Sequence, residues 1–174
     1  MLAGQKTVIR ALEYEDLEHL WRWQNDLTVM AQMWIEPTSL RALQKEYEDE
    51  LGNKRSKRFL IAEKATGQPT GVVWYYSMTP NSSCEVGIYI GDPKLHGKGY
   101  GSDALLTFLR FLFNVKNMHR VGLSVSSNNQ QAIASYRKCG FKHEGATREF
   151  AYIDGQYVDL VNMGILKTEF QELD

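Results

Sequence analysis

Three glycines in the middle of the chain mark a sharp change from strand-like to helix-like sequence. The run 85–90 is short and rich in β-branched residues, as expected of a β-strand, and apolar residues recur after Gly101 with the spacing of one helix face. Between the two lies the loop 96–102, with the sequence HGKGYGS. Because glycine has no Cβ, such a loop lets backbone N–H groups approach a ligand closely. The chain is therefore expected to place a strand, a glycine-rich loop and a helix in direct succession.

The glycine loop has two chemical interpretations. The first turn of a helix leaves N–H donors unpaired at its positive dipole end, so a pyrophosphate fits there. The spacing excludes a Walker loop, in which Ser or Thr follows the lysine, because Gly99 follows Lys98. It also excludes a dinucleotide fingerprint, because GxGxG replaces GxGxxG. The alternative is a plain strand-to-helix turn that glycine makes easier.

The order of the remaining elements predicts an α/β (α+β) fold. The pattern indicates a strand, two helices, three antiparallel strands, a helix, a strand, a helix and a C-terminal hairpin. The hairpin is expected because Asp154-Gly155, a type I′ turn signal, separates strand-like runs at 144–153 and 156–166. We expect one domain over residues 1–174, with a mixed, mostly antiparallel sheet of about seven strands flanked by about four helices.

Composition excludes several classes of protein. The net charge of −1 provides no basic stripe for nucleic acid. No run is long and apolar enough for a signal peptide or a membrane span. The two cysteines, Cys84 and Cys139, cannot form a disulfide framework, and no CxxC pair indicates zinc. We therefore expect a cytoplasmic protein with no nucleic-acid partner, no membrane partner and no metal.

Two spaced motifs together resemble the GNAT superfamily of N-acetyltransferases. Residues 88–101 read IYI-x5-HGKGYG, and residues 129–141 read N-x2-A-x3-Y-x2-CGF. The hairpin 152–159, YIDGQYVD, is similar to the ending of the bacterial ribosomal-protein and spermidine acetyltransferase branch. The resemblance is strongest over residues 58–166. It implies an enzyme that transfers an acetyl group from acetyl-CoA to a primary amine by direct attack in a ternary complex.

This resemblance also implies where the coenzyme binds. The family loop reads Q/R-x-x-G-x-G/A, so Gly99 and Gly101 match, whereas His96 stands at the Gln or Arg position. The strand 88–90 is expected to pair its backbone with the pantetheine arm, and to splay from the strand 121–125 so that a slot opens for the thioester. The residues expected to contact the coenzyme are Ile88, Tyr89, Ile90, His96, Gly97, Lys98, Gly99, Tyr100, Gly101, Ser102, Asn129 and Tyr136.

The implied reaction assigns two catalytic candidates. Tyr136 matches the family's general acid, since a phenol with a pKa of about 10 stays protonated at neutral pH and can protonate the departing thiolate. Its alternative role is a core aromatic. Glu85 is a candidate base acting through a water, because strand alternation places it on one face with Gly87 and Tyr89; the alternatives are an exposed edge carboxylate, and loss of the proton to solvent. A backbone N–H near Ile88 or Tyr89 would stabilise the oxyanion.

Two residues of the second motif have structural alternatives. Asn129 matches a position that contacts the pantetheine or orients the next helix, and it equally suits a helix N-cap. Cys139 invites a covalent acyl-cysteine mechanism. The four histidines lie at no recognisable partner spacing, so the sequence favours a packing role for this thiol.

The acceptor amine is the least constrained part of the prediction. We expect Trp34, Glu36 and Glu85 to bind it, because WIEP at 34–37 resembles the spermidine branch. Glu36 and the acidic run 46–50 can attract a polyamine such as spermidine or spermine, unless they form only a solvated helix face. Acetylation of a protein N-terminus and a non-catalytic acetyl-CoA-binding regulatory module stay open. Relatives often form dimers or rings, which implies a homo-oligomer by analogy.

Overall fold

An eight-stranded sheet forms the centre of the protein in the computed structural model, which describes residues 1–33, 35–153 and 155–170. The strand order is β1-β2-β3-β4-β5-β6-β8-β7. Among the described strands only β5 and β6 pair in parallel, so the predicted mixed, mostly antiparallel sheet is confirmed. The strands are β1 (Leu2–Ala3), β2 (Thr7–Ala11), β3 (Lys57–Glu63), β4 (Pro69–Thr79), β5 (Ser83–Ile90), β6 (Arg120–Ser126), β7 (Lys142–Ile153) and β8 (Gln156–Leu166).

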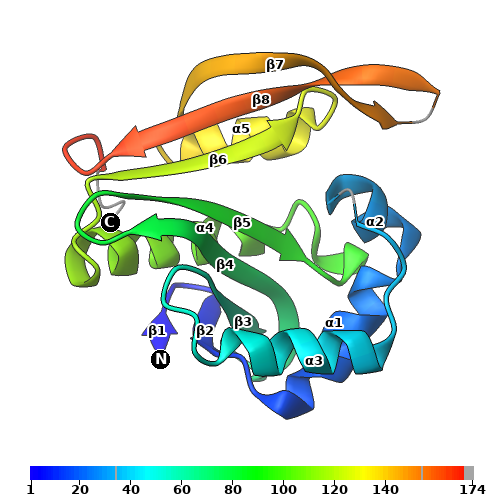
Figure 1. Ribbon diagram of the computed structural model, residues 1–174. Coiled ribbons are helices and arrows are strands. Elements are labelled where there is room, and N and C mark those ends of the chain that lie inside the picture. Colours follow the sequence, from blue (N-terminus) through cyan, green and yellow to red (C-terminus); the bar gives the residue numbers. More distant parts are fainter. Residues whose placement is uncertain (34, 154, 171–174) are drawn as a thin grey trace.

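Helices cover both faces of this sheet (Figure 1). The α-helices in the described ranges are α1 (Leu17–Gln24), α2 (Leu27–Met33), α3 (Leu40–Glu50), α4 (Tyr100–Arg110) and α5 (Gln130–Lys138). Two helices were expected before β3, but three form. Asp26 Oδ1 accepts a hydrogen bond from Thr28 N (2.9 Å), which starts α2 as a separate helix. No helix in these ranges is long and apolar enough to cross a membrane.

Strand alternation divides the core into two layers. Leu60 on β3 and Val72 on β4 pack with α1 and α3, whereas their neighbours Ile61 and Val73 pack with α4. All four side chains are almost completely buried. Each such burial stabilises the fold by about 1.5–3 kcal/mol. The central strands β3 and β4 are therefore covered on both faces, and the middle of each reads as a nearly continuous apolar run.

The parallel pair β5 and β6 is joined at only one end. The ladder runs from Ser83 opposite Arg120 to Glu85 opposite Gly122, although β5 continues to Ile90 and β6 to Ser126. Beyond that point β5 stays paired with β4, and β6 stays paired with β8. The two strands are therefore held firmly on their outer sides while they diverge, which confirms the predicted splayed pair.

The C-terminal hairpin β7–β8 forms the edge of the sheet beside β6 (Figure 1). Its first strand begins at Lys142, two residues earlier than expected, and contains two irregularities, at 143–145 and 147–151. Asp154 of the predicted turn lies outside the described residues. Gly155 has φ +83°, a left-handed conformation that suits glycine and that a type I′ turn requires.

Candidate active site

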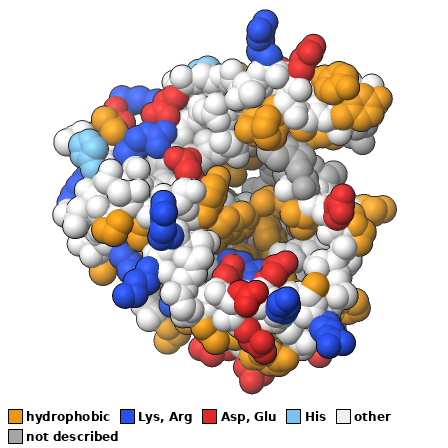
Figure 2. Space-filling model, viewed as in Figure 1, with side chains coloured by type: hydrophobic (Ala, Val, Ile, Leu, Met, Phe, Trp, Pro, Cys, Tyr) orange, Lys and Arg blue, Asp and Glu red, His pale blue; other side chains and the backbone are white. Residues whose placement is uncertain are grey.

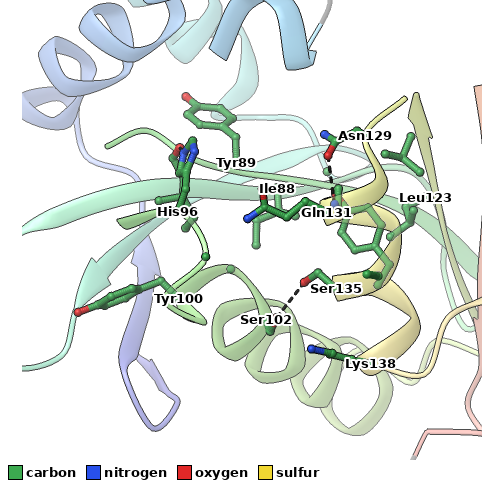
Figure 3. A pocket seen from close by; sticks show the side chains of 18 of the residues that line it. Ile88, Tyr89, His96, Tyr100, Ser102, Leu123, Asn129, Gln131, Ser135 and Lys138 are labelled. Carbon is green, nitrogen blue, oxygen red and sulfur yellow. Dashed lines mark hydrogen bonds between the residues drawn. The ribbon is translucent and has the colours of Figure 1, made fainter. Parts of the chain in front are cut away.

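A cavity of about 470 Å³ occupies the opening between the splayed strands. Its walls come from residues 86–90 of β5, residues 123–126 of β6, the loop before α4, and α5 (Figure 3). Every residue expected to contact the coenzyme lines this cavity except Lys98. The sequence motifs, which lie up to 48 positions apart between Ile88 and Tyr136, therefore converge on one slot.

The glycine loop presents the start of α4 to this slot. Gly97 (φ +72°) and Gly99 (φ +86°) both adopt left-handed conformations, and Gly99 is the N-cap of α4. The N–H of Asp103 bonds to the carbonyl of Gly99 (3.0 Å), so the first-turn N–H groups before it have no carbonyl partner within the helix. The positive end of an eleven-residue helix thus borders the cavity, which suits an anion.

Contacts behind the loop hold it in this conformation. His96 Nε2 donates a hydrogen bond to Ile90 O (2.8 Å), so the ring ties the loop to the end of β5. Lys98 does not line the slot; its carbonyl accepts a hydrogen bond from Lys6 Nζ (2.7 Å). The hydroxyl of Tyr100 donates to Glu63 on β3. These contacts fix the loop from several elements. His96, which stands where the family loop has Gln or Arg, makes one of them.

The helix α5 forms the opposite wall. Asn129 Oδ1 accepts a hydrogen bond from Ala132 N (3.1 Å), which confirms the helix N-cap, and Asn129 also lines the slot. Sequence reasoning missed three polar residues of α5 that line the slot, Gln131, Ser135 and Lys138 (Figure 3). Their i, i+4, i+7 spacing places them on one helix face, and this signal is visible in the sequence.

Tyr136 reaches the slot from α5 about two turns after Asn129. Its ring is half-buried and lies 6.2 Å from the ring of Phe141. Burial, with a smaller contribution from Cys139, raises the pKa of Tyr136 to about 12. The phenol is therefore neutral at physiological pH and is a hydrogen-bond donor in the wall of the slot.

Both cysteines are free and buried. Cys139 belongs to the main core cluster, and its Sγ lies 3.8 Å from the carbonyl of Ser102. Burial raises the pKa of the Cys139 thiol to about 11, whereas a nucleophile acts as the thiolate. The structure therefore places this cysteine in a packing role, as the sequence favoured.

Glu85 lies at the closed end of the splay. It stands opposite Tyr76 in the ladder, on the same face of β5 as Gly87 and Tyr89, as alternation predicted. Its Oε1 forms an ion pair with Arg120 Nη1 at 3.1 Å, and it does not line the slot. The carboxylate is thus partnered rather than freely exposed, and its role as a base stays a prediction.

A second cavity of about 220 Å³ lies on the α1–α3 side of β5. Trp74, Tyr76 and Tyr89 give it aromatic walls, and Met33 and Tyr89 line both cavities. The two cavities therefore meet beside β5. Figure 2 shows the centre of the molecule hollowed, with apolar side chains inside and acidic side chains gathered at the rim beside α3.

The charged residues that line the second cavity form an ion pair. Arg58 Nε lies 2.8 Å from Glu50 Oε2, and Arg58 Nη1 lies 3.6 Å from Glu46 Oε2. Arg58 Nη2 is buried and has no hydrogen-bond partner within the described residues. Burial raises the pKa of Tyr89, whose hydroxyl is also buried, above its usual value. The second cavity is thus an aromatic pocket with one compensated charge pair.

Of the three predicted acceptor residues, the two that the structure describes, Glu36 and Glu85, line neither cavity. Trp34 lies outside the described residues, Glu36 is exposed and lines neither cavity, and Glu85 is paired with Arg120. Trp74 and Tyr76, which do line the second cavity, were missed. Their period-two spacing on β4 was a visible signal for a shared face. In the described part of the chain, no three His, Cys, Asp or Glu side chains gather where a metal ion could bind.

Comparison with known proteins identifies the family. The model of the acetyltransferase (GNAT) domain matches residues 6–142. Spermidine N(1)-acetyltransferase of Vibrio cholerae is 30% identical over 169 residues, 96% of each chain. The [ribosomal protein uS5]-alanine N-acetyltransferase of Escherichia coli is 30% identical over 79 residues, 45% of this chain and 40% of that one. The structure of the Vibrio cholerae spermidine enzyme in complex with CoA and spermine superposes with a TM-score of 0.89 at 28% identity, covering 95% and 98%. The chain belongs to the GNAT family of N-acetyltransferases, whose co-substrate is acetyl-CoA.

Proposed function

We propose that the protein transfers the acetyl group of acetyl-CoA to a primary amine of a polyamine such as spermidine or spermine. One observation carries this proposal: the slot and the aromatic pocket meet beside β5 at Met33 and Tyr89. A thioester and an amine can then occupy adjoining spaces in one complex, as direct attack requires. The full-length similarity to two bacterial spermidine N(1)-acetyltransferases supports the acceptor class.

The slot residues divide the binding of the coenzyme between them. In this proposal the N–H groups of residues 97–102 bind the pyrophosphate at the start of α4. The residues Ile88, Tyr89 and Ile90 offer the unpaired edge of β5 to the amide groups of the pantetheine arm. Asn129 completes the wall at the start of α5. Each part of the ligand thus meets main-chain groups that the splay and the loop leave available.

Proton transfer is assigned to groups on the two sides of the slot. Tyr136, neutral because of its raised pKa, protonates the departing thiolate. Glu85 shares its strand face with Tyr89, on the side of the aromatic pocket, and accepts the proton of the amine through a water. An N–H of Ile88 or Tyr89 stabilises the oxyanion.

The surroundings of the aromatic pocket favour a cationic acceptor. The helix α3 carries the acidic residues Glu46, Glu48, Asp49 and Glu50, and Glu50 lines the pocket. Figure 2 shows acidic side chains at this rim. Negative charge at the mouth of a cleft raises the local concentration of a cation. We therefore place the entry of the amine beside the C-terminal half of α3.

One observation favours a second acceptor class, a protein N-terminus. Arg58 Nη2 is a buried donor with no partner within the described residues, and a peptide carbonyl could accept its hydrogen bond. The partial similarity to the uS5 enzyme points the same way. A polyamine has no carbonyl, so only a peptide acceptor could accept a hydrogen bond from this guanidinium through its carbonyl.

Thiol release from acetyl-CoA tests these proposals directly. The purified protein is assayed with spermidine, spermine, short diamines and short peptides with free N-termini. Turnover with polyamines and none with peptides supports the polyamine proposal, and the reverse result replaces it with the peptide acceptor. Tight acetyl-CoA binding without turnover of any amine would instead indicate a regulatory module.

We further propose a single cytoplasmic domain that self-associates. The eight strands of the described chain form one sheet, which supports a single domain. Two free, buried cysteines suit a reducing compartment. Tyr152 and Tyr157 on the hairpin are each 66% exposed and meet edge to face, which supports contact with another copy. Light scattering during gel filtration measures the assembly.

A further inference from the structure

Trp74 forms an aromatic wall of the second cavity because its partner across the ladder is glycine. Trp74 on β4 stands directly opposite Gly87 on β5. A Cβ added at Gly87 would lie 2.1 Å from Cζ2 and 2.3 Å from Cε2 of the indole. The ring therefore lies flat on the backbone of β5. Any larger residue at position 87 would displace it.

The indole that packs against Gly87 still exposes part of its surface to a ligand. Trp74 is only half-buried, lines the second cavity, and meets Tyr89 edge to face at 6.1 Å between ring centroids. Tyr89 in turn borders the slot, so the indole stands beside the junction of the two cavities. A ligand that reaches from the pocket toward the slot would pass this ring.

The charged residues of the second cavity pair with one another, which leaves the indole as the group that can attract a cation. The charged residues among its lining are Glu50 and Arg58, which neutralise one another across 2.8 Å. An ammonium group inside the pocket therefore finds no uncompensated carboxylate in the lining. The face of an indole attracts a cation through its quadrupole, most strongly where water is excluded.

We propose that Trp74 is a specificity-determining residue that holds the internal ammonium group of the acceptor against its indole face. This inference rests on the proposed polyamine acceptor. Because the ring packs against the backbone at Gly87, its conformation is fixed before the ligand binds. Little side-chain conformational entropy is therefore lost on binding. The pocket then distinguishes a polyamine from a diamine of the same length by the charge in the middle of the chain.

The test compares spermidine with the linear diamine in which a methylene replaces its internal nitrogen. The parent should prefer spermidine. In Trp74→Leu, kcat/KM for spermidine should fall about tenfold, mainly through KM, while that for the diamine falls about threefold or less. Trp74→Phe should keep most of the preference, because phenylalanine retains an aromatic face. Gly87→Ala, which displaces the indole, should lose the preference as Trp74→Leu does.

Trp23→Leu is the matched control. Trp23 also lies against a glycine at the end of β5, Gly91, where an added Cβ would be 2.1 Å away, but it lines neither cavity. Its replacement should leave the preference unchanged, and calorimetry should show coenzyme A binding to all variants. Equal losses for both amines in Trp74→Leu, or an unchanged preference, would overturn the inference alone. A parent that does not acetylate spermidine would overturn the proposed acceptor, and this inference with it.

Discussion

Tyr136 shows how burial changes the acidity of one side chain. A phenol in water has a pKa of about 10, and burial in the wall of the slot raises the pKa of Tyr136 to about 12. The thiol of coenzyme A, like a free cysteine thiol, has a pKa of about 8.5. In the proposed mechanism the phenol gives its proton to the sulfur as the C–S bond breaks. The hydroxyl remains available as a donor across the physiological range.

The variant Tyr136→Phe removes this donor and little else. Turnover should fall by about 10²–10⁴, the usual contribution of a general acid, whereas the Kd for acetyl-CoA should change little because the ring is retained. Steady-state kinetics and calorimetry measure the two quantities. Parent-like turnover in this variant would remove Tyr136 from the mechanism.

The raised pKa of Tyr136 also predicts the shape of the pH profile. The acidic form is the active one, and it is lost only as pH rises through about 12. Activity should therefore rise with pH as the acceptor amine loses its proton, with no fall caused by Tyr136 below about pH 11. A descending limb near pH 10 in the kcat profile, absent from Tyr136→Phe, would show that the phenol titrates much earlier.

Gly99 offers a test of the anion site. Valine at a position with φ +86° is strained, and its side chain would project toward Lys6 Nζ, which lies 3.5 Å from an added Cβ. Gly99→Val should weaken acetyl-CoA binding at least tenfold in calorimetry, because the loop N–H groups no longer converge.

Gly67→Val is the matched control for this variant. Gly67 has nearly the same conformation, φ +73°, with open space around it, in the turn between β3 and β4. It should show a comparable loss of thermal stability with unchanged coenzyme affinity. Equal affinity in Gly99→Val and the parent would mean that the loop is only a turn.

Motifs with fixed local spacing could be predicted from the sequence, and contacts that depend on strand register could not. The loop glycines, Tyr136 and the Asn129 cap are read from neighbours along the chain. By contrast, the packing of Trp74 against Gly87 can be predicted only when the register of β4 with β5 is known. Glu36 and Glu85 line neither cavity, and the side chains around the second cavity come from segments that sequence alone does not align.

At the scale of elements, the splay of β5 from β6 depends on what holds each strand from outside. β5 is paired with β4 as far as Ile90, and β6 is paired with β8 as far as Ser126. Strand identity was predictable from apolar runs between turns. The extent of each strand was harder to predict: β4 covers Pro69–Thr79 and so includes turn-forming residues at both of its ends. Cross-strand hydrogen bonds extend a strand into turn-forming residues whose local preference is weak.

Asp103 joins the N-terminal segment to α4, and the sequence gives no sign of this. Its carboxylate accepts hydrogen bonds from the N–H groups of Gln5 (2.8 Å), Lys6 (3.0 Å) and Thr7 (2.8 Å), and from Thr7 Oγ1 (2.6 Å). Burial acts to raise the pKa of Asp103, but these hydrogen bonds outweigh it and lower the pKa below its usual value. The same segment places Lys6 behind the glycine loop.

Asp103→Asn should therefore destabilise the fold at neutral pH. The loss should be about 1–2 kcal/mol, at the low end for hydrogen bonds to a charged group because the carboxylate is partly exposed to solvent. A lowered folded-state pKa gives stability that is present above about pH 4 and is lost as pH falls through the folded value. Urea unfolding at several pH values measures this, and the gap between parent and variant should shrink in acid. A gap that stays constant from pH 7 to pH 3 would show that the charge of Asp103 does not contribute.

At the scale of the whole molecule, one sheet lies between the slot and the second cavity, and the linings of the two cavities share Met33 and Tyr89. Ile88 faces the α4 core, whereas Tyr89 faces the α1–α3 core, and both border the slot. At the splay, where the pairing of β5 with β6 ends, the sheet no longer separates these two layers completely. In the proposed complex, a thioester entering between β5 and β6 meets an amine held on the far face. The order of elements predicted this architecture, but only the three-dimensional arrangement places Met33 and Tyr89 at the junction of the cavities.

The most direct test of the account is a crystal structure with coenzyme A and spermidine bound. We expect the pyrophosphate on the N–H groups of residues 97–102, the pantetheine arm along residues 88–90 of β5, and the sulfur within hydrogen-bonding reach of the Tyr136 hydroxyl. One primary amine of spermidine should lie at the junction beside Tyr89, with the rest of the chain in the second cavity. Coenzyme density away from the opening between β5 and β6, with the loop amides turned inward, would contradict the account.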